Sequence, residues 1–211
     1  MRTIGAVTVG RSDYYIYQPI LKQIQAESEL ELRLYLSGSH LLPEFGLTVQ
    51  EIENDGYPIA ARIEMLLSSD TPESISKSMG RGTVGFAEAY ARERPDILLV
   101  LGDRFEMHSA VTASLPFQIP VAHIHGGEIT EGATDDAMRH AITKLSALHF
   151  VAADEYRTRV IQLGETPARV FAVGAPGIDN ITNLDLIGRR GLEKQLGVPK
   201  NQRFFLVTYH P

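Results

Sequence analysis

Residues 97–104 read Ile-Leu-Leu-Val-Leu-Gly-Asp-Arg, so five consecutive apolar residues are followed by a glycine and two charged residues. An apolar run of this length is typical of a strand buried on both faces, and such strands belong to parallel sheets that helices cover on both sides. In these sheets the ligand binds outside the carboxyl ends of the strands. The run therefore predicts a parallel α/β sheet and places Asp103 and Arg104 at its ligand-binding edge.

Strand patterns and helical patterns alternate along the rest of the chain. Strands are predicted over residues 3–9, 30–36, 97–101, 119–124, 148–151 and 170–173. Helices are predicted over residues 15–26, 49–54, 72–92, 105–114, 135–147 and 154–163. This alternation predicts a Rossmann-like parallel sheet with helices on both faces.

The end of the chain has the pattern of an unfinished unit. Residues 203–209, Arg-Phe-Phe-Leu-Val-Thr-Tyr, look like another strand, and the sequence stops two residues later. A parallel strand needs a crossover connection and a partner strand. We therefore expect residues 1–174 to form one Rossmann-like domain, and residues 175–211 to be a linker and the first strand of a second, truncated one. The alternative is that this strand joins the first sheet and completes the chain.

The composition excludes several classes of protein. With 211 residues, 44% hydrophobic and 22% charged, the chain has ordinary globular usage, unlike a disordered, collagen-like or coiled-coil protein. The formal net charge of −6 argues against a nonspecific nucleic-acid partner. No apolar run approaches the ~20 residues that span a bilayer, so we expect no membrane partner. No signal peptide is visible after Met1, which favours a cytoplasmic location.

Two motifs suggest cofactors, and both have a more ordinary explanation. Gly80-x-Gly82-x-x-Gly85 matches a dinucleotide fingerprint, but that fingerprint requires a preceding strand, and here the preceding residues are helical. We interpret the glycines as a close-packed helix face. His123-x-His125 could form part of a metal site, but no further ligand spacing supports one. We therefore expect neither a metal nor a nicotinamide cofactor.

Charged residues gather where strands end. Arg11 and Asp13 follow the first predicted strand, where they form either a simple turn or an anion contact at a helix N-terminus. His40 follows the second strand.

The densest group lies between His125 and His140, with Glu128, Asp135, Asp136 and Arg139. One aspartate could cap the next helix and Arg139 could be its ion-pair partner. The number of ionisable groups nevertheless favours a catalytic or ligand site.

These segments resemble the UDP-N-acetylglucosamine 2-epimerase family over essentially the whole chain. The motifs that carry the resemblance are Arg11-Ser-Asp-Tyr, Ser37-Gly-Ser-His-Leu, Pro43-Glu-Phe-Gly-Leu-Thr, Leu101-Gly-Asp-Arg, His123-Ile-His-Gly-Gly-Glu, Asp135-Asp-x-x-Arg-His-Ala-Ile-Thr-Lys, Val173-Gly-x-Pro-Gly-x-Asp-Asn and Val207-Thr-Tyr-His-Pro. They are more similar to the hydrolysing branch than to the non-hydrolysing branch of that family.

The resemblance implies the N-terminal half of a two-domain enzyme with the GT-B arrangement, a UDP-sugar substrate, no cofactor and a homo-oligomeric state. It implies that most of the UDP site lies beyond Pro211, so that this chain alone is inactive. The implied reaction eliminates UDP from UDP-N-acetylglucosamine and re-adds water, giving N-acetylmannosamine. One alternative hypothesis is that the enzyme performs the same chemistry on UDP-N,N′-diacetylbacillosamine. Another is that the protein is a GT-B glycosyltransferase or a sugar-nucleotide binding module.

By position and resemblance, the residues of the site fall into two groups. The candidate catalytic residues are Asp103, Glu128, Asp135 and His210. The candidate substrate-binding residues are Arg11, Asp13, His40, His125, Asp136 and Arg139.

Overall fold

The computed structural model describes residues 1–183, 186–200, 202–203 and 205–209. The chain divides into two compact units, residues 1–180 and 181–211, and each is described by itself. The first unit contains the sheet. The second contains helix α8 (Arg189–Leu196), which ends at Gly197 in a left-handed conformation. His210 lies outside the described residues.

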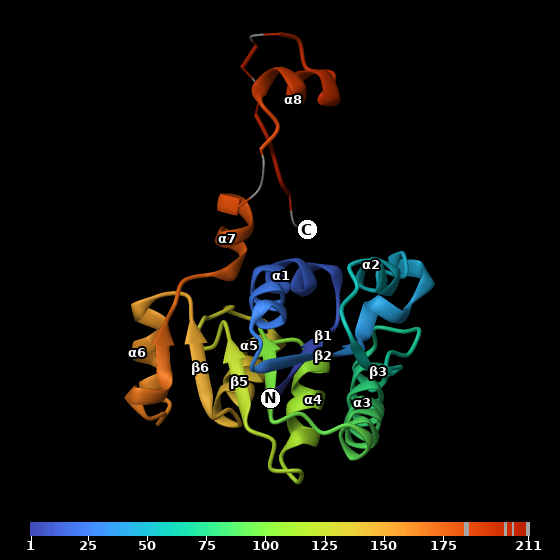
Figure 1. Cartoon of the computed structure of the whole chain (residues 1–211), viewed down its shortest axis with the longest axis vertical. Helices are drawn as coiled ribbons and strands as arrows, with labels where there is room; N and C mark the ends of the chain where they lie inside the picture. Colours follow the sequence, from blue (N-terminus) through green and yellow to red (C-terminus); the bar gives the residue numbers. More distant parts are fainter. Residues whose placement is uncertain (184–185, 201, 204, 210–211) are drawn as a thin grey trace. The chain divides into compact units, whose positions relative to one another are not determined.

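A seven-stranded parallel sheet forms the centre of the first unit, in the order β3-β2-β1-β4-β5-β6-β7 (Figure 1). Its strands are β1 (Arg2–Thr8), β2 (Leu30–Ser37), β3 (Ile59–Ile63), β4 (Ile97–Leu101), β5 (Val121–Ile124), β6 (Leu148–Val151) and β7 (Val170–Ala172). Because β1 pairs with both β2 and β4, the strand order reverses between β1 and β4. Ligands of open α/β sheets bind at such a reversal.

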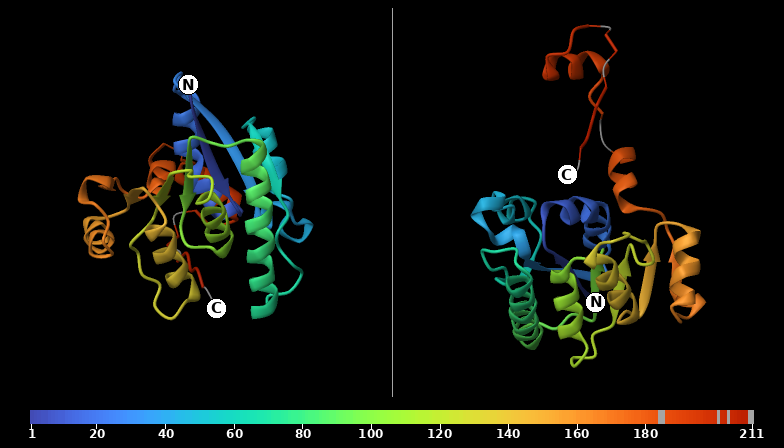
Figure 2. Two further views of the ribbon diagram at one scale, coloured as in Figure 1. Left: turned by 90° about the horizontal axis from the view of Figure 1, so that it is seen from below. Right: turned by 180° about the vertical axis from the view of Figure 1, so that it is seen from behind.

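Helices cover both faces of this sheet. They are α1 (Arg11–Ala26), α2 (Val49–Asn54), α3 (Pro72–Arg92), α4 (Phe105–Ser114), α5 (Thr134–Lys144) and α6 (Asp154–Gln162), and a further helix, α7 (Pro176–Asn183), follows β7. Helices α1 and α2 lie on one face, and α3 and α4 lie on the other (Figures 1 and 2). Helix α4 packs between α3 and α5. In the described part of the chain, no helix is both long and apolar enough to cross a membrane.

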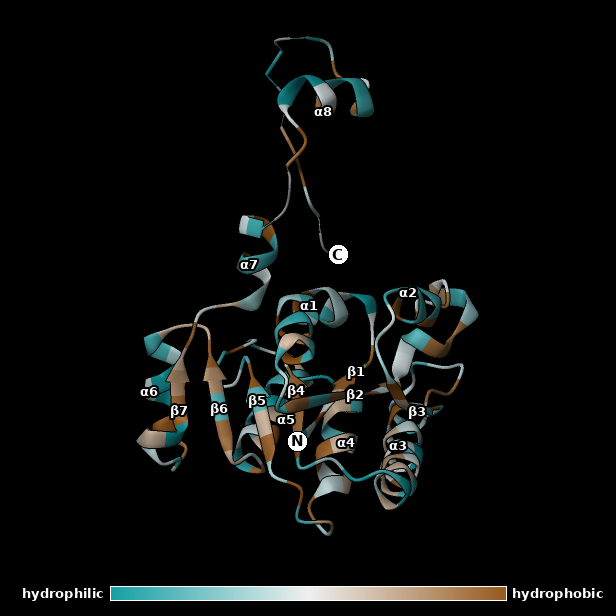
Figure 3. Ribbon diagram, viewed as in Figure 1, coloured by the Kyte–Doolittle hydropathy of each residue, from teal (hydrophilic) through white to brown (hydrophobic). Residues whose placement is uncertain are grey.

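The core lies between the sheet and its helices. Apolar residues concentrate on the strands (Figure 3), and Leu34, Leu98 and Val100 are fully buried. Aromatic rings fill the layers beside them, with Tyr35 packed edge-on against Tyr90 at 5.3 Å between ring centroids. Burial of these side chains on both faces explains why the central strands have uninterrupted apolar sequences.

Most of the predicted elements are present, with three differences. Strand β3 was not predicted, because Ile59–Ile63 is a short edge strand that contains the exposed Arg62 and in which only Ile63 is buried. Helix α1 begins at Arg11 instead of residue 15, because Gly10 is already extended and its N–H donates to Asp13. Helices α7 and α8 were also not predicted.

The strand expected over residues 203–209 does not form in the described part of that segment. Residues 205–209 have no strand pairing, and Phe205 and Leu206 are almost fully exposed. A strand is held by hydrogen bonds to a neighbouring strand, and none adjoins the described residues here. The first compact unit runs to residue 180, and Asn180 on α7 donates a hydrogen bond to the backbone oxygen of Tyr15.

The glycine motif in α3 is a packing surface, as predicted. A Cβ on Gly82 would lie 2.6 Å from Met65 Cε, and a Cβ on Gly85 would lie 2.6 Å from Ile63 Cγ2. These glycines therefore let α3 approach the segment that contains β3. They lie within the helix itself and not in a turn between strand and helix, which is where a dinucleotide fingerprint operates.

Candidate active site

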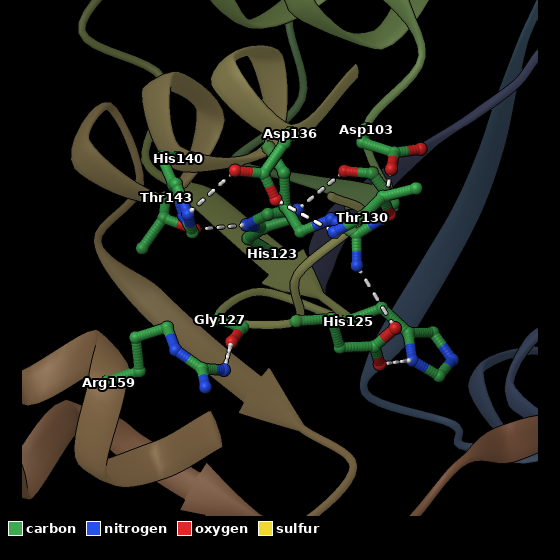
Figure 4. Close-up of polar contacts among 12 residues, drawn as sticks. Asp103, His123, His125, Gly127, Thr130, Asp136, His140, Thr143 and Arg159 are labelled. Atoms are coloured by element: carbon green, nitrogen blue, oxygen red, sulfur yellow. Dashed lines mark hydrogen bonds and ion pairs between the residues drawn. The ribbon is translucent and has the colours of Figure 1, made fainter. Parts of the chain in front are cut away.

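The polar edge of the sheet is built by loops that follow three strands. Gly10 and Arg11 follow β1, Gly102–Arg104 follow β4, and a longer loop from His125 leads from β5 into α5. These strands are neighbours in the parallel sheet, so their carboxyl ends meet beside the reversal between β1 and β4. Figure 4 shows the polar side chains of the β4 and β5 loops converging there.

Arg139 on α5 holds the centre of this edge. Its guanidinium makes an ion pair with Asp103, and its Nη1 donates to Glu128 Oε2 at 3.1 Å. Its Nη2 also donates to Thr130 Oγ1 at 3.1 Å. Only 8% of the Arg139 side chain is exposed. One buried cation thus joins two carboxylates that come from different loops.

The second oxygen of Glu128 is bound by His125. Nδ1 of His125 lies 2.5 Å from Glu128 Oε1. Burial opposes ionisation of Glu128, but the hydrogen bond from His125 and the positive charge of Arg139 outweigh it and lower the pKa of this carboxyl. Glu128 is therefore ionised at neutral pH, with both of its oxygens occupied.

The backbone of the β5 loop explains why the sequence His125-Gly-Gly-Glu folds in this way. His125 has a φ of +64°, which is uncommon for a residue with a side chain. Gly127 also has a positive φ, of +79°, and a Cβ there would lie 2.6 Å from the backbone oxygen of Tyr156. Arg159 donates a hydrogen bond to the Gly127 carbonyl (Figure 4). The backbone of this loop is therefore tightly constrained, and it directs the Glu128 side chain toward Arg139.

His123 connects the β4 loop to α5 beneath the site. Its ring is fully buried, with Nε2 2.8 Å from the Gly102 carbonyl and Nδ1 3.1 Å from Thr143 Oγ1. Burial lowers the pKa of His123 to about 3, so the ring is neutral. Because a carbonyl only accepts hydrogen bonds, Nε2 donates to Gly102 and Nδ1 accepts from Thr143. Among the described residues, no group of acidic or histidine side chains could hold a metal ion.

The two aspartates at the start of α5 have different environments. Asp136 Oδ1 accepts a hydrogen bond from the Thr130 backbone N–H at 2.9 Å, and Asp136 Oδ2 lies 3.5 Å from His140 Nε2. Asp135 is exposed and lies close enough to Arg104 to raise the pKa of that guanidinium. Asp136 therefore fixes the loop, and Asp135 is the aspartate available to a ligand.

Asp13 and His40, both expected to bind substrate, are buried and occupied by protein partners. Asp13 accepts hydrogen bonds from the Val9 and Gly10 backbone N–H groups at 2.8 Å. Burial raises the pKa of Asp13 to about 6, against the effect of those hydrogen bonds. His40 lies between Thr8 and Thr48, 2.8 and 2.6 Å from their hydroxyls, and burial lowers its pKa to about 4. These two side chains support the edge from within.

The cations at the surface of the edge are Arg11 and Arg104. Arg11 is exposed at the first position of α1, where free backbone N–H groups and the helix dipole favour an anion. Arg104 precedes α4 and is paired with the fully buried Glu106 through contacts of 2.7 and 3.2 Å. Burial opposes the charge of Arg104, but the pairing with Glu106 prevails and raises its pKa.

Three contributors were given no role from sequence: Glu106, Thr130 and the buried His123. Arg104 was placed at this edge because it follows a buried strand, and Glu106 could have been found from its spacing of two residues from Arg104. Nothing in the sequence marks the hydroxyl of Thr130 as a partner of Arg139. His210 lies outside the described residues, so its predicted role stays a prediction.

Comparisons with known proteins identify the family of this chain. A sequence model of the UDP-N-acetylglucosamine 2-epimerase family matches residues 22–211. The chain is 40% identical over 210 residues to the GDP/UDP-N,N′-diacetylbacillosamine 2-epimerase (hydrolyzing) of Campylobacter jejuni, covering 100% of this chain and 54% of that protein. It is 37% identical over 211 residues to the UDP-N,N′-diacetylbacillosamine 2-epimerase (hydrolyzing) of Legionella pneumophila, covering 100% and 56%.

A crystal structure of a UDP-N-acetylglucosamine 2-epimerase has the same fold. It superposes with a TM-score of 0.78 at 18% identity, over 92% of this chain and 54% of that one. This chain thus spans about half the length of the proteins it matches. Because the family match extends over nearly all of its residues, the chain belongs to the UDP-N-acetylglucosamine 2-epimerase family.

Proposed function

We propose that the whole protein containing this chain is a hydrolysing 2-epimerase of a UDP-linked 2-acetamido sugar. The observation that carries the proposal is the pair of carboxylates, Asp103 and Glu128, held by one buried arginine at the reversal point of the sheet. Ionisable groups arranged in this way suit proton transfer at a carbon of low acidity. The names of the two curated relatives support the same reaction class.

The reaction has two requirements that this edge could meet. A base must take the proton from C2 of the sugar as the C1–O bond breaks and UDP leaves, and an acid must later return a proton to C2 from the opposite face as water adds to C1. Asp103, Glu128 and Asp135 are the carboxylates proposed to take part in these proton transfers, directly or through a neighbouring side chain. The leaving diphosphate needs cations, and the exposed Arg11 and Arg104 could supply them.

The remaining parts of the proposal concern the protein beyond this edge. We propose a Rossmann-like domain over residues 1–174 and a second one that begins within residues 175–211, and His210 stays a predicted catalytic residue. Arg139 and Asp136 would position the substrate-binding loop, with His125 beside them. A UDP-sugar as sole ligand, a homo-oligomeric state and a cytoplasmic location stay predictions.

Two substrates fit the proposed chemistry. UDP-N,N′-diacetylbacillosamine is favoured because the names of the Campylobacter jejuni and Legionella pneumophila relatives contain this sugar. UDP-N-acetylglucosamine, which would yield N-acetylmannosamine for sialic-acid synthesis, is supported by the family description. The two sugars differ at C4 and C6, and no residue described above is assigned to those positions.

The decisive test is proton NMR of the whole protein in D₂O with each UDP-sugar in turn. Release of UDP together with a 2-deuterated, manno-configured sugar is expected, and the sugar that is consumed identifies the substrate. Binding without turnover of either sugar would overturn the proposal in favour of a glycosyltransferase or a sugar-nucleotide binding module. A glycosyltransferase would also leave C2 free of deuterium.

A further inference from the structure

We propose that His125 Nε2 is the base that takes the C2 proton, and that Glu128 acts through His125 as a positioning residue. The inference rests on the proposed epimerase function and names the proton-transfer atom within it. It follows from the hydrogen bonds among Arg139, Glu128 and His125, which leave Nε2 of His125 without a partner among the described residues.

Glu128 and Asp103 are poorly placed to act as the base themselves. Glu128 has one oxygen on Arg139 Nη1 and the other on His125 Nδ1. Asp103 is paired with the same guanidinium. A carboxylate that is stabilised by a cation and by hydrogen bonds is a weaker proton acceptor. Taking a proton would cost each of these groups its best partner.

The imidazole of His125 is arranged to accept a proton instead. An ionised carboxylate only accepts hydrogen bonds, so the hydrogen between the two side chains is on Nδ1 of His125. In the neutral ring, Nε2 then carries a lone pair. Among the described residues Nε2 of His125 has no hydrogen-bond partner, and 16% of its side chain is exposed. Figure 4 shows this ring at the opposite end of the polar array from His140.

The backbone also indicates that the position of the ring matters. His125 adopts a φ of +64°, a conformation that costs a residue with a side chain free energy. The next two residues are glycines, which adopt a positive φ at a lower cost in free energy than histidine does. Strain of this kind is retained where the surrounding structure fixes a functional group. Here the fixed group is the imidazole, whose Nδ1 lies 2.5 Å from Glu128 Oε1.

The Nε2 lone pair takes the proton from C2, and the electrons of the C2–H bond form the C1=C2 double bond. The C1–O bond breaks and its electron pair leaves on UDP. The products are a 2-acetamidoglycal, UDP and an imidazolium paired with Glu128, and the imidazolium then returns its proton to water. The later addition of water to the glycal does not require this base.

The test uses the whole protein and the variant His125→Gly, because glycine keeps the left-handed backbone without strain. We expect consumption of the UDP-sugar to fall about 10²-fold or more, and added imidazole to restore at least about 10-fold of it. His125→Asn retains a side-chain donor for Glu128 and tolerates the backbone, so it should be equally slow and should not respond to imidazole. His108→Gln, on α4 outside these contacts, is the matched control and should match wild type with or without imidazole.

Two further measurements separate a base from a structural residue. His125→Gly should still hydrate the 2-acetamidoglycal, supplied with UDP, at close to the wild-type rate. The double variant His125→Gly/Glu128→Gln should be no slower than His125→Gly alone, because groups that act as one unit are not additive. Wild-type protein without turnover would refute the proposed function itself. An active wild type, with a His125→Gly variant that is either fast or not rescued by imidazole, would refute the role of His125 alone.

Discussion

Arg139 on α5 and Asp103 after β4 form an ion pair that connects two loops of the sheet edge, although 36 residues separate them in the sequence. The same guanidinium reaches Glu128 and Thr130. This single cation therefore sets the spacing of the acidic groups, and most of the expected variant effects follow from it.

Asp103→Asn and Glu128→Gln should each lower kcat of the whole protein by about 10²-fold or more, the usual scale for groups that take part in proton transfer. Glu131→Gln is the control, because Glu131 lies exposed in the same loop. Steady-state release of UDP measures all three. Near-normal turnover in both carboxamide variants would contradict the assignment of the carboxylates.

Arg139→Lys should lower kcat by about 10²-fold, because an ammonium group cannot hold two carboxylates and a hydroxyl in the geometry of the guanidinium fork. Arg62→Lys, in an exposed pair with Glu53, should change turnover little. Circular dichroism of both variants checks that the fold is retained. A fully active Arg139→Lys variant would show that charge alone is sufficient.

Arg11→Ala should raise KM for the UDP-sugar by about 10-fold with a smaller change in kcat, the scale of one charge-assisted hydrogen bond. Lys22→Ala removes an exposed cation from the same helix and should leave KM unchanged. An unchanged KM in Arg11→Ala would mean that Arg11 is a surface residue of the turn.

His40 makes stability depend on pH. Burial holds the pKa of folded His40 at about 4, compared with 6.5 in the unfolded chain. Below pH 6.5 the unfolded chain binds a proton that the folded chain does not, so the free energy of unfolding falls by up to about 3 kcal/mol as the pH approaches 4. His40→Asn should remove this part of the dependence.

Urea unfolding of the 211-residue chain between pH 4 and 7 measures this difference. Asp13, whose pKa is raised to about 6, stabilises the folded chain as the pH falls. Its effect is the same in wild type and in His40→Asn, so it cancels when the two are compared. Parallel curves for wild type and His40→Asn would contradict the prediction.

Two glycines of α3 should respond in opposite ways to alanine. Gly80 has open space where a Cβ would be, so Gly80→Ala should raise the free energy of unfolding by about 1 kcal/mol through helix propensity. Gly85→Ala should lower it, because its Cβ would lie 2.6 Å from the branched side chain of Ile63. Thermal unfolding of both variants provides the comparison, and equal shifts would refute the packing role.

The sheet and the convergence of its charged residues could be predicted from sequence because both follow from strand patterns. Asp103, Glu128 and Arg139 follow or flank buried strands, and parallel topology brings such positions to one edge. Strand β3 was not predicted, because an edge strand lacks the double-sided burial that produces a continuous apolar run.

The direction of individual side chains was beyond sequence reasoning. Asp13 and His40 are at the expected edge but point inward to backbone amides and threonine hydroxyls. The pairing of His125 with Glu128 depends on a left-handed residue that is not glycine, and no local pattern indicates one. Side-chain partners are set by loop conformation, which strand patterns do not specify.

The pairing of β1 with β4 has a consequence for how the edge comes into being. The backbone N–H of Asp96 donates to the Thr3 carbonyl at 2.9 Å, although 93 residues separate the two in the sequence. Contacts of such long sequence separation form late, because the entropy of closing a long loop is lost before they contribute. The polar edge is therefore expected to form late in folding, and during synthesis it cannot assemble until α5 has left the ribosome. Binding of a nucleotide sugar would then report completion of the sheet.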